Sequence, residues 1–221
     1  MNPEIIIMLT NNDITVTNAE EVFESCKDLP AKKWGFKDIG LPKEEMIQLA
    51  KKMKDAGKET YIEVVTYTEE GCLELAYECG FDYLTGALPF DSVFEYAKEH
   101  NLKYSPFCGT VGGSPVALSG TIDEIVASAK DCIAKGATGV DLTAYRYVDG
   151  NPIELTRAVV EAIGADKVCI AGSVGNVERM NEMKEAGVAE YTMGSALFNA
   201  NFVKDGTFRE NLEFVLDYLK K

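Results

Sequence analysis

The stretch Cys169-Ile170-Ala171-Gly172-Ser173-Val174 sets the pattern of this chain, because it is a short apolar run that ends on small residues. A second stretch of the same kind is Thr192-Met193-Gly194-Ser195-Ala196-Leu197. Between them lies a helical pattern that closes on Gly187, and a glycine just past a helix satisfies its last carbonyls in the left-handed conformation. The pattern predicts a strand, a helix and a second strand parallel to the first.

Apolar runs of this kind recur along the whole chain, with amphipathic helical patterns between them. Eight such runs in 221 residues give about 28 residues for each unit, roughly what a strand, a helix and two short loops need. The runs lie at residues 4–9, 33–39, 60–66, 81–86, 103–109, 139–146, 167–174 and 191–197.

This alternation predicts an α/β fold, a closed eight-stranded parallel (β/α)8 barrel with helices on its outer face. An open doubly wound sheet also alternates strands and helices. However, the chain has no Gly-x-Gly-x-x-Gly turn after its first strand, and eight is the number of units in the barrel. No linker, low-complexity segment or change in composition interrupts the sequence, so we expect residues 1–221 to form a single domain.

The composition narrows the range of partners and cofactors. Acidic residues number 36 and basic residues 22, and the net charge of −14 argues against a nucleic-acid or anionic membrane partner. A single histidine, His100, excludes a His-rich zinc site, and we predict neither a metal nor a cofactor. The six cysteines form no Cys-x-x-Cys motif, and no signal segment or apolar stretch of about 18 residues is present. We therefore expect a cytoplasmic protein.

In such barrels the carboxyl ends of the strands form the working face. The last two strand ends are rich in small residues, which let an anion approach the backbone so that consecutive N–H groups can bind it without a lysine. The hydroxyl groups of Ser173 and Ser195 add donors. We predict a phosphate site at Gly172, Ser173, Gly194 and Ser195, although glycines at these positions also suit short turns.

The paired glycine-rich ends and the trailing Gly194-Ser195-Ala196-Leu197-Phe198 resemble the ribulose-phosphate-binding barrel superfamily, which comprises phosphate-binding TIM barrels. The resemblance covers the whole chain in architecture, and residues 172–174 and 194–198 in motif. It implies that main-chain N–H groups around Ser173 and Ser195 hold the phosphate of a sugar or a related substrate. Members of this superfamily often carry two glycines at the end of strand seven, where this chain has Ser173 second.

Three charged residues interrupt otherwise apolar strands: Lys37, Glu63 and Asp141. A charge buried in a parallel strand is costly unless it is paired, and Lys37 and Glu63 can neutralise one another from adjacent strands. Such a pair can position a carbonyl group, exchange a proton next to it or, if burial lowers the pKa of Lys37, form a Schiff base. We take all three as candidate catalytic residues, with a structural ion pair as the alternative.

Further candidates lie in the loops after the strands. Arg146 can hold a carboxylate or phosphate in bidentate fashion, or form a surface salt bridge. Asn11 is a candidate substrate-binding residue, and Asp13 beside it suits either the mouth of the barrel or a turn. Residues 109–120 form a long loop with four glycines, which we interpret as a lid, a flexible excursion or an oligomer interface.

The functional hypothesis is an enzyme that acts on a small phosphorylated sugar or keto acid by acid–base enolisation, as an isomerase or epimerase. One alternative is an aldolase-like carbon–carbon lyase with a Schiff base on Lys37. Class I aldolase barrels, however, commonly carry the Schiff-base lysine on strand six, where this chain has Asp141. A second is a non-catalytic barrel that senses a phosphorylated metabolite. A third is a lyase with Mg²⁺ held by Glu63, Asp141 and Asp13. A homodimer is possible in each case.

Overall fold

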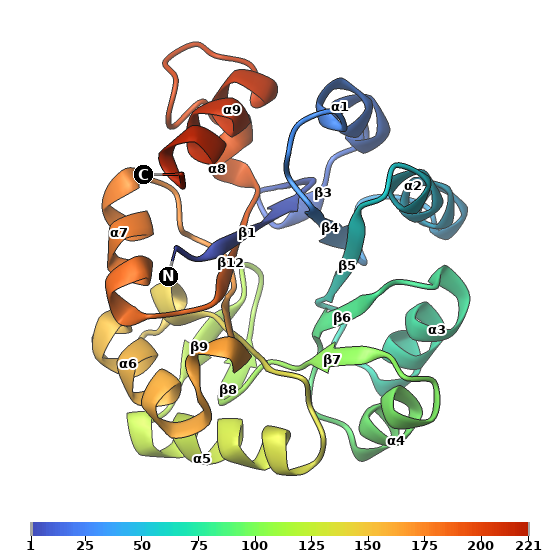
Figure 1. Cartoon of the computed structure of the whole chain (residues 1–221). Coiled ribbons are helices and arrows are strands. Elements are labelled where there is room, and N and C mark those ends of the chain that lie inside the picture. Colours follow the sequence, from blue (N-terminus) through green and yellow to red (C-terminus); the bar gives the residue numbers. More distant parts are fainter. Residues whose placement is uncertain (1, 221) are drawn as a thin grey trace.

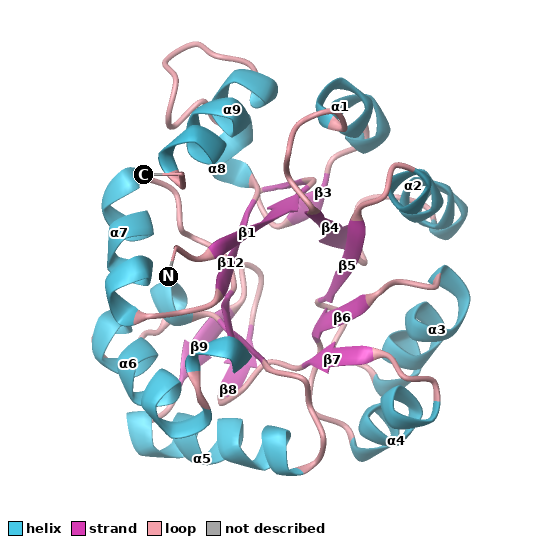
Figure 2. Cartoon of the chain, in the orientation of Figure 1, coloured by secondary structure: helices cyan, strands magenta, loops and turns pink. Residues whose placement is uncertain are grey.

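Eight parallel strands occupy the centre of the molecule, and helices surround them (Figure 1 and Figure 2). This computed structural model describes residues 2–220. The strands of the barrel are β1 (Glu4–Met8), β4 (Lys33–Lys37), β5 (Glu59–Val64), β6 (Tyr83–Gly86), β7 (Lys103–Ser105), β10 (Val140–Leu142), β11 (Val168–Ile170) and β12 (Glu190–Met193). Their order around the sheet is β10-β11-β12-β1-β4-β5-β6-β7.

The two ends of this order, β10 and β7, nearly close the barrel. The backbone N–H of Thr138 donates to the carbonyl of Tyr104, and that of Asp141 to the carbonyl of Pro106, both at 2.8 Å. The predicted α/β barrel is therefore confirmed. Each predicted apolar run contains a strand, and all but the run at 81–86 extend further at their carboxyl ends, where the chain enters the loops of the mouth.

Helices follow the strands on the outer face. Local signals in the sequence explain where several of them begin and end: Thr121 and Glu124 form a capping box, Asn151 caps the following helix, and Gly187 closes another in the left-handed conformation. No helix within residues 2–220 is both long and apolar enough to cross a membrane. The helices are α1 (Ala19–Cys26), α2 (Lys43–Asp55), α3 (Glu69–Cys79), α4 (Asp91–Glu99), α5 (Ile122–Ala134), α6 (Pro152–Ile163), α7 (Val177–Ala186), α8 (Ser195–Phe198) and α9 (Phe208–Tyr218), with short 3₁₀ turns η1 (Ala144–Arg146) and η2 (Ala165–Lys167).

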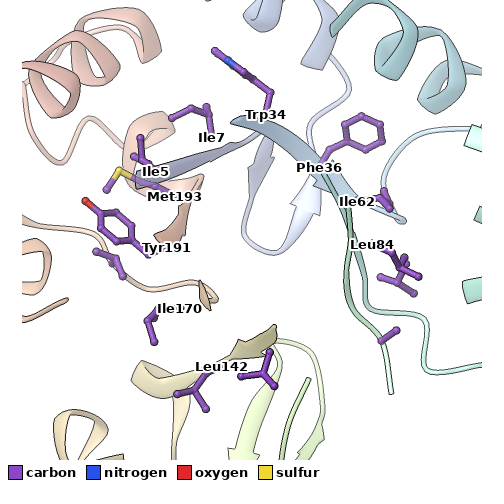
Figure 3. Packing of buried hydrophobic residues seen from close by; sticks show 14 of the residues in the cluster. Ile5, Ile7, Trp34, Phe36, Ile62, Leu84, Leu142, Ile170, Tyr191 and Met193 are labelled. Carbon is purple, nitrogen blue, oxygen red and sulfur yellow. The ribbon is translucent and has the colours of Figure 1, made fainter. Parts of the chain in front are cut away.

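The main hydrophobic core lies between the strands and the helices. Trp34 and Phe36 of β4 point outward into this layer, as does Ile62 of β5 (Figure 3). Because successive side chains of a strand point to opposite faces, the alternate residues point into the barrel. Lys37 and Glu63 belong to this inward set, and they are also neighbours in the pairing of β4 with β5. The alternation of the strands thus places both charges inside the barrel.

Two small hairpins stand at the mouth of the barrel. One consists of β2 (Thr10–Asn11) and β3 (Ile14–Thr15), and the other of β8 (Thr110–Gly112) and β9 (Ala117–Ser119). The second hairpin corresponds to the long loop expected at residues 109–120. Its Val116 and Leu118 side chains are buried, so this segment is a packed hairpin and not a flexible excursion.

Candidate active site

A cavity of about 260 Å³ opens at the carboxyl ends of the strands. Lys37 and Glu63 line one part of it. The segments that follow β11 and end β12, residues 171–175 and 192–196, line another part. The charged pair and the glycine-rich segments, which lie far apart in the sequence, therefore share one cavity.

The segment after β11 presents its backbone to the cavity. Gly172 and Ser173 both have positive φ angles, 73° and 64°, so the serine adopts the left-handed conformation that a second glycine would adopt more easily. The amide of Gly172 donates to the Thr192 hydroxyl at 2.8 Å. Within residues 2–220, the amides of Ser173, Val174 and Gly175 donate to no protein acceptor, which leaves them available to an anion.

The segment at the end of β12 is packed tightly against β1 and the first hairpin. A Cβ atom on Gly194 would lie 2.6 Å from the Thr10 carbonyl oxygen, so only glycine fits there. The Ser195 hydroxyl accepts a hydrogen bond from the backbone N–H of Asn12 at 2.9 Å. Close packing thus fixes the position of the second glycine-rich segment in the cavity wall.

Arg179, on α7, brings a positive charge to the same wall and was not singled out from the sequence. Its guanidinium donates to the Ser173 carbonyl oxygen at 2.5 Å and lies over the Tyr145 ring, 4.4 Å from the ring centroid. Nothing in the local pattern marks this arginine, because it stands among other charged residues at the start of an ordinary amphipathic helix. Its place beside the glycine-rich segment follows from the packing of the fold.

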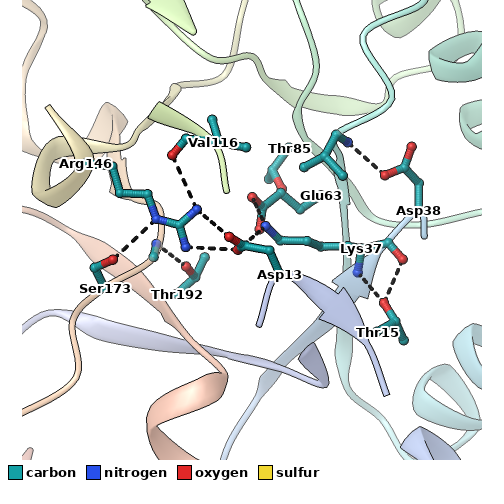
Figure 4. A network of polar contacts seen from close by, with 12 residues as sticks. Asp13, Thr15, Lys37, Asp38, Glu63, Thr85, Val116, Arg146, Ser173 and Thr192 are labelled. Atoms are coloured by element: carbon teal, nitrogen blue, oxygen red, sulfur yellow. Dashed lines mark hydrogen bonds and ion pairs between the residues drawn. The ribbon is translucent and has the colours of Figure 1, made fainter. Parts of the chain in front are cut away.

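Lys37 is held between two carboxylates. Its Nζ atom lies 2.8 Å from Oδ1 of Asp13 and 3.2 Å from Oε1 of Glu63 (Figure 4). Burial disfavours the charged ammonium, but the charges of Glu63 and Asp13 outweigh it and raise the pKa of Lys37 above its ordinary value. Lys37 is therefore a buried ammonium ion at neutral pH.

Arg146 binds a carboxylate in the bidentate manner considered from the sequence, and this carboxylate is the chain's own Asp13. Its NH1 and NH2 atoms donate to the two oxygens of Asp13 at 2.8 and 2.9 Å. Its Nε atom donates to the Ser173 hydroxyl at 3.3 Å (Figure 4). Burial of Asp13 opposes ionisation, but the hydrogen bonds from Arg146 and the charge of Lys37 outweigh it, so the pKa of Asp13 is lowered.

Asp141 is fully buried in β10, and both of its carboxyl oxygens lack a hydrogen-bond partner. It is not among the residues that line the cavity, although the charges of Glu63 and Lys37 act on it. Burial, reinforced by the negative charge of Glu63, raises the pKa of Asp141 well above its ordinary value. The carboxyl group of Asp141 therefore holds its proton to a higher pH than an exposed aspartate does.

Replacement of Asp141 by asparagine is expected to stabilise the protein at neutral pH. A carboxyl group with a higher pKa in the folded state costs stability as the pH rises above its unfolded pKa, and asparagine cannot ionise. We expect the free energy of unfolding at pH 7 to rise, and the gain to shrink below about pH 4, where the carboxyl group is protonated in the unfolded chain as well. Urea unfolding at both pH values measures this. A loss of stability at pH 7, or a gain independent of pH, would contradict a raised pKa of Asp141.

Asn11 does not line the cavity, and its buried Oδ1 atom has no hydrogen-bond partner. Asp13, two residues further along the same hairpin, lines the cavity instead. Within residues 2–220, no three His, Cys, Asp or Glu side chains gather in an arrangement that could hold a metal ion. Asp13 and Glu63, two of the oxygen ligands considered for Mg²⁺, flank the Lys37 ammonium.

Models of known protein families do not match the chain, and neither do curated protein sequences. Solved structures share its fold. Orotidine 5′-phosphate decarboxylase from Pyrococcus horikoshii has a TM-score of 0.69 at 13% identity and covers 98% of this chain and 99% of its own. N-acetylmannosamine-6-phosphate 2-epimerase from Clostridium perfringens has a TM-score of 0.64 at 10% identity, and the alignment covers 98% of this chain and 93% of the epimerase. A native KDPGal structure has a TM-score of 0.69 at 17% identity, and the alignment covers 100% of this chain and 96% of that one. These likenesses support the TIM-barrel architecture over the full length of the chain.

Proposed function

We propose that this protein is an enzyme that acts on a small phosphorylated sugar or keto acid and moves a proton at the carbon next to its carbonyl group, as an isomerase or epimerase does. The single observation that carries the proposal is that the Lys37–Glu63 pair and the two glycine-rich segments line one cavity. Two of the similar structures belong to proteins whose names contain a phosphorylated compound, which supports the proposal by analogy of fold.

The phosphate group is anchored by the glycine-rich wall. The amides of Ser173, Val174 and Gly175 have no other acceptor in the part of the chain that the structure describes, and the Ser195 hydroxyl and Arg179 stand beside them. Main-chain donors fixed in this way bind an anion with little loss of side-chain entropy. The phosphate thereby fixes the position of the carbons that react.

The Lys37–Glu63 pair carries out the proton transfer. The Glu63 carboxylate accepts a proton from the carbon next to the carbonyl group, and the electron pair of the broken C–H bond passes to the carbonyl oxygen. The Lys37 ammonium stabilises the negative charge that develops on this oxygen. If Glu63 returns the proton to the neighbouring carbon, while the hydroxyl proton on that carbon passes to the former carbonyl oxygen, the product is an isomer. If a water molecule on the opposite face instead protonates the first carbon, and Glu63 later releases its proton to solvent, the product is an epimer.

A Schiff base on Lys37 has less support. Its formation needs a neutral amine, whereas Lys37 is paired with two carboxylates and its pKa is raised. The contacts of Lys37 thus oppose the lowered pKa that Schiff-base formation would need. The geometry supports an ammonium ion that polarises a carbonyl group.

Deuterium exchange tests the proposal. The protein is incubated in D₂O with phosphorylated ketoses and keto acids and with their unphosphorylated counterparts, and proton NMR follows the loss of signal at the carbon next to the carbonyl. We expect exchange with a phosphorylated compound only, and Glu63→Gln should retain its binding but lose exchange. Binding without exchange across the panel would favour the sensor, and borohydride trapping of a Lys37 adduct would favour the lyase.

A further inference from the structure

We propose that Lys37 and Arg146 form a second anion subsite, that the chain fills it with its own Asp13 carboxylate, and that the substrate carries a carboxylate that replaces Asp13. This inference rests on the proposed function and narrows its substrate class to phosphorylated carboxylic acids. It does not depend on which carbon loses a proton.

The contacts of Asp13 are those of a bound carboxylate ligand. Both of its oxygens accept from the terminal nitrogens of Arg146, at 2.8 and 2.9 Å, and Oδ1 also lies 2.8 Å from Nζ of Lys37. A planar guanidinium that meets both oxygens of a carboxylate is the geometry by which proteins recognise this group with high specificity. The two cations therefore form a preorganised carboxylate subsite.

Asp13 reaches this subsite from the tip of a small hairpin. Asn12 and Asp13 form the turn between two strands of only two residues each, with φ angles of 50° and 63°. Lys37 and Arg146, in contrast, extend from the end of a barrel strand and from the 3₁₀ turn that follows another. Removal of the Asp13 carboxylate thus requires rotation of its side chain or a shift of the hairpin tip, where the Asn12 amide is bonded to the Ser195 hydroxyl, while both cations keep their places.

Space for the displaced carboxylate exists next to the subsite. A second cavity, of about 330 Å³, is lined by Asp13, Lys37, Tyr67 and Val116. Asp13 and Lys37 also line the main cavity. The Tyr67 hydroxyl is buried there without a hydrogen-bond partner. It can donate to the Asp13 carboxylate once Arg146 and Lys37 hold another anion.

Arg146 also sets the spacing between the two anionic groups. Its terminal nitrogens hold the carboxylate, while its Nε atom donates to the hydroxyl of Ser173, within the segment proposed to bind phosphate. The carboxylate subsite and this segment therefore lie at two edges of one guanidinium. This spacing suits a short acid whose phosphate and carboxylate are a few carbons apart.

A pair of ligands that differ only in the second anionic group tests the proposal. 3-Phosphoglycerate has a carboxylate where glycerol 3-phosphate has a hydroxymethyl group, and isothermal titration calorimetry measures the dissociation constant of each. We expect wild-type protein to bind 3-phosphoglycerate more tightly. Asp13→Asn should widen the ratio of the two constants about tenfold, because the acid no longer competes with an internal carboxylate. Glu45→Gln, which removes an exposed charge from α2, should leave the ratio unchanged.

The outcomes separate this inference from the proposed function. Equal binding of the two ligands by the wild-type protein would overturn the carboxylate subsite alone. So would a ratio that stays constant or narrows in Asp13→Asn. If neither ligand nor inorganic phosphate binds, the phosphate site and the proposed function fail with it. Should Asp13→Asn fold poorly, the wild-type ratio and its loss in Arg146→Gln decide the matter.

Discussion

Replacement of Lys37 by methionine is expected to lower kcat/KM about 10³-fold. Methionine keeps the length of the side chain but removes the positive charge that stabilises the developing oxyanion. The same change leaves Glu63 buried without its cation, so the free energy of unfolding should fall by about 3 kcal/mol. Steady-state kinetics on the substrate found by deuterium exchange, corrected for the folded fraction, measures the effect.

Lys33 provides a matched control for this substitution. Lys33 is the first residue of β4, and Lys37 is the last. At the opposite end of the barrel from Lys37, the Nζ atom of Lys33 lies 2.6 Å from a carboxylate oxygen of Glu4 and 2.5 Å from one of Glu190. Lys33→Met removes the same charge from the same strand and should leave kcat/KM within about threefold. Equal losses of corrected kcat/KM in the two variants would contradict a specific role of Lys37 in the reaction.

Gly194→Ala is expected to weaken the binding of inorganic phosphate more than tenfold and to cost about 1–3 kcal/mol of stability. The added Cβ atom would meet the Thr10 carbonyl oxygen at 2.6 Å and the Met8 carbonyl oxygen at 3.0 Å, both on the backbone of the β1 region. Since neither can move freely, the chain at residues 194–196 must shift away from the cavity wall. Calorimetric titration with phosphate and urea unfolding measure the two effects.

Gly112→Ala is the control for this substitution, in a glycine that does not line the cavity. A Cβ atom there would meet no heavy atom within 4 Å. This variant should bind phosphate within about threefold of wild type and unfold at a similar urea concentration. If Gly194→Ala bound phosphate as well as Gly112→Ala does, the second glycine-rich segment would have no part in the phosphate site.

The architecture was predictable because its cause is local and repeated. Each unit carries its own apolar run and helical stripe, and several helix ends carry their own signals, such as Gly187 and the Thr121 capping box. The alternation along β4 and β5 also explains why Lys37 and Glu63 meet, since they are inward neighbours in paired strands. Repetition of one pattern along the chain thus determined both the barrel and its central charged pair.

The contribution of Asp13 was not predictable in the same way. Its partners Lys37 and Arg146 are 24 and 133 residues away, and Asn12-Asp13 also forms a tight turn, which accounts for an aspartate without any role in a site. The sequence suggested both Asn11 and Asp13 for the mouth of the barrel, with a turn as the alternative for Asp13, and the structure places only Asp13 in the cavity lining. Contacts that depend on how a hairpin tip folds over the mouth have no periodic signature.

An amide-resolved NMR titration with glycerol 3-phosphate tests the central claim most directly. The account predicts that the N–H signals of residues 172–175 and 194–196 shift together and saturate with a single dissociation constant. Shifts confined to one of the two segments, or a response only at residues remote from the mouth of the barrel, would contradict it.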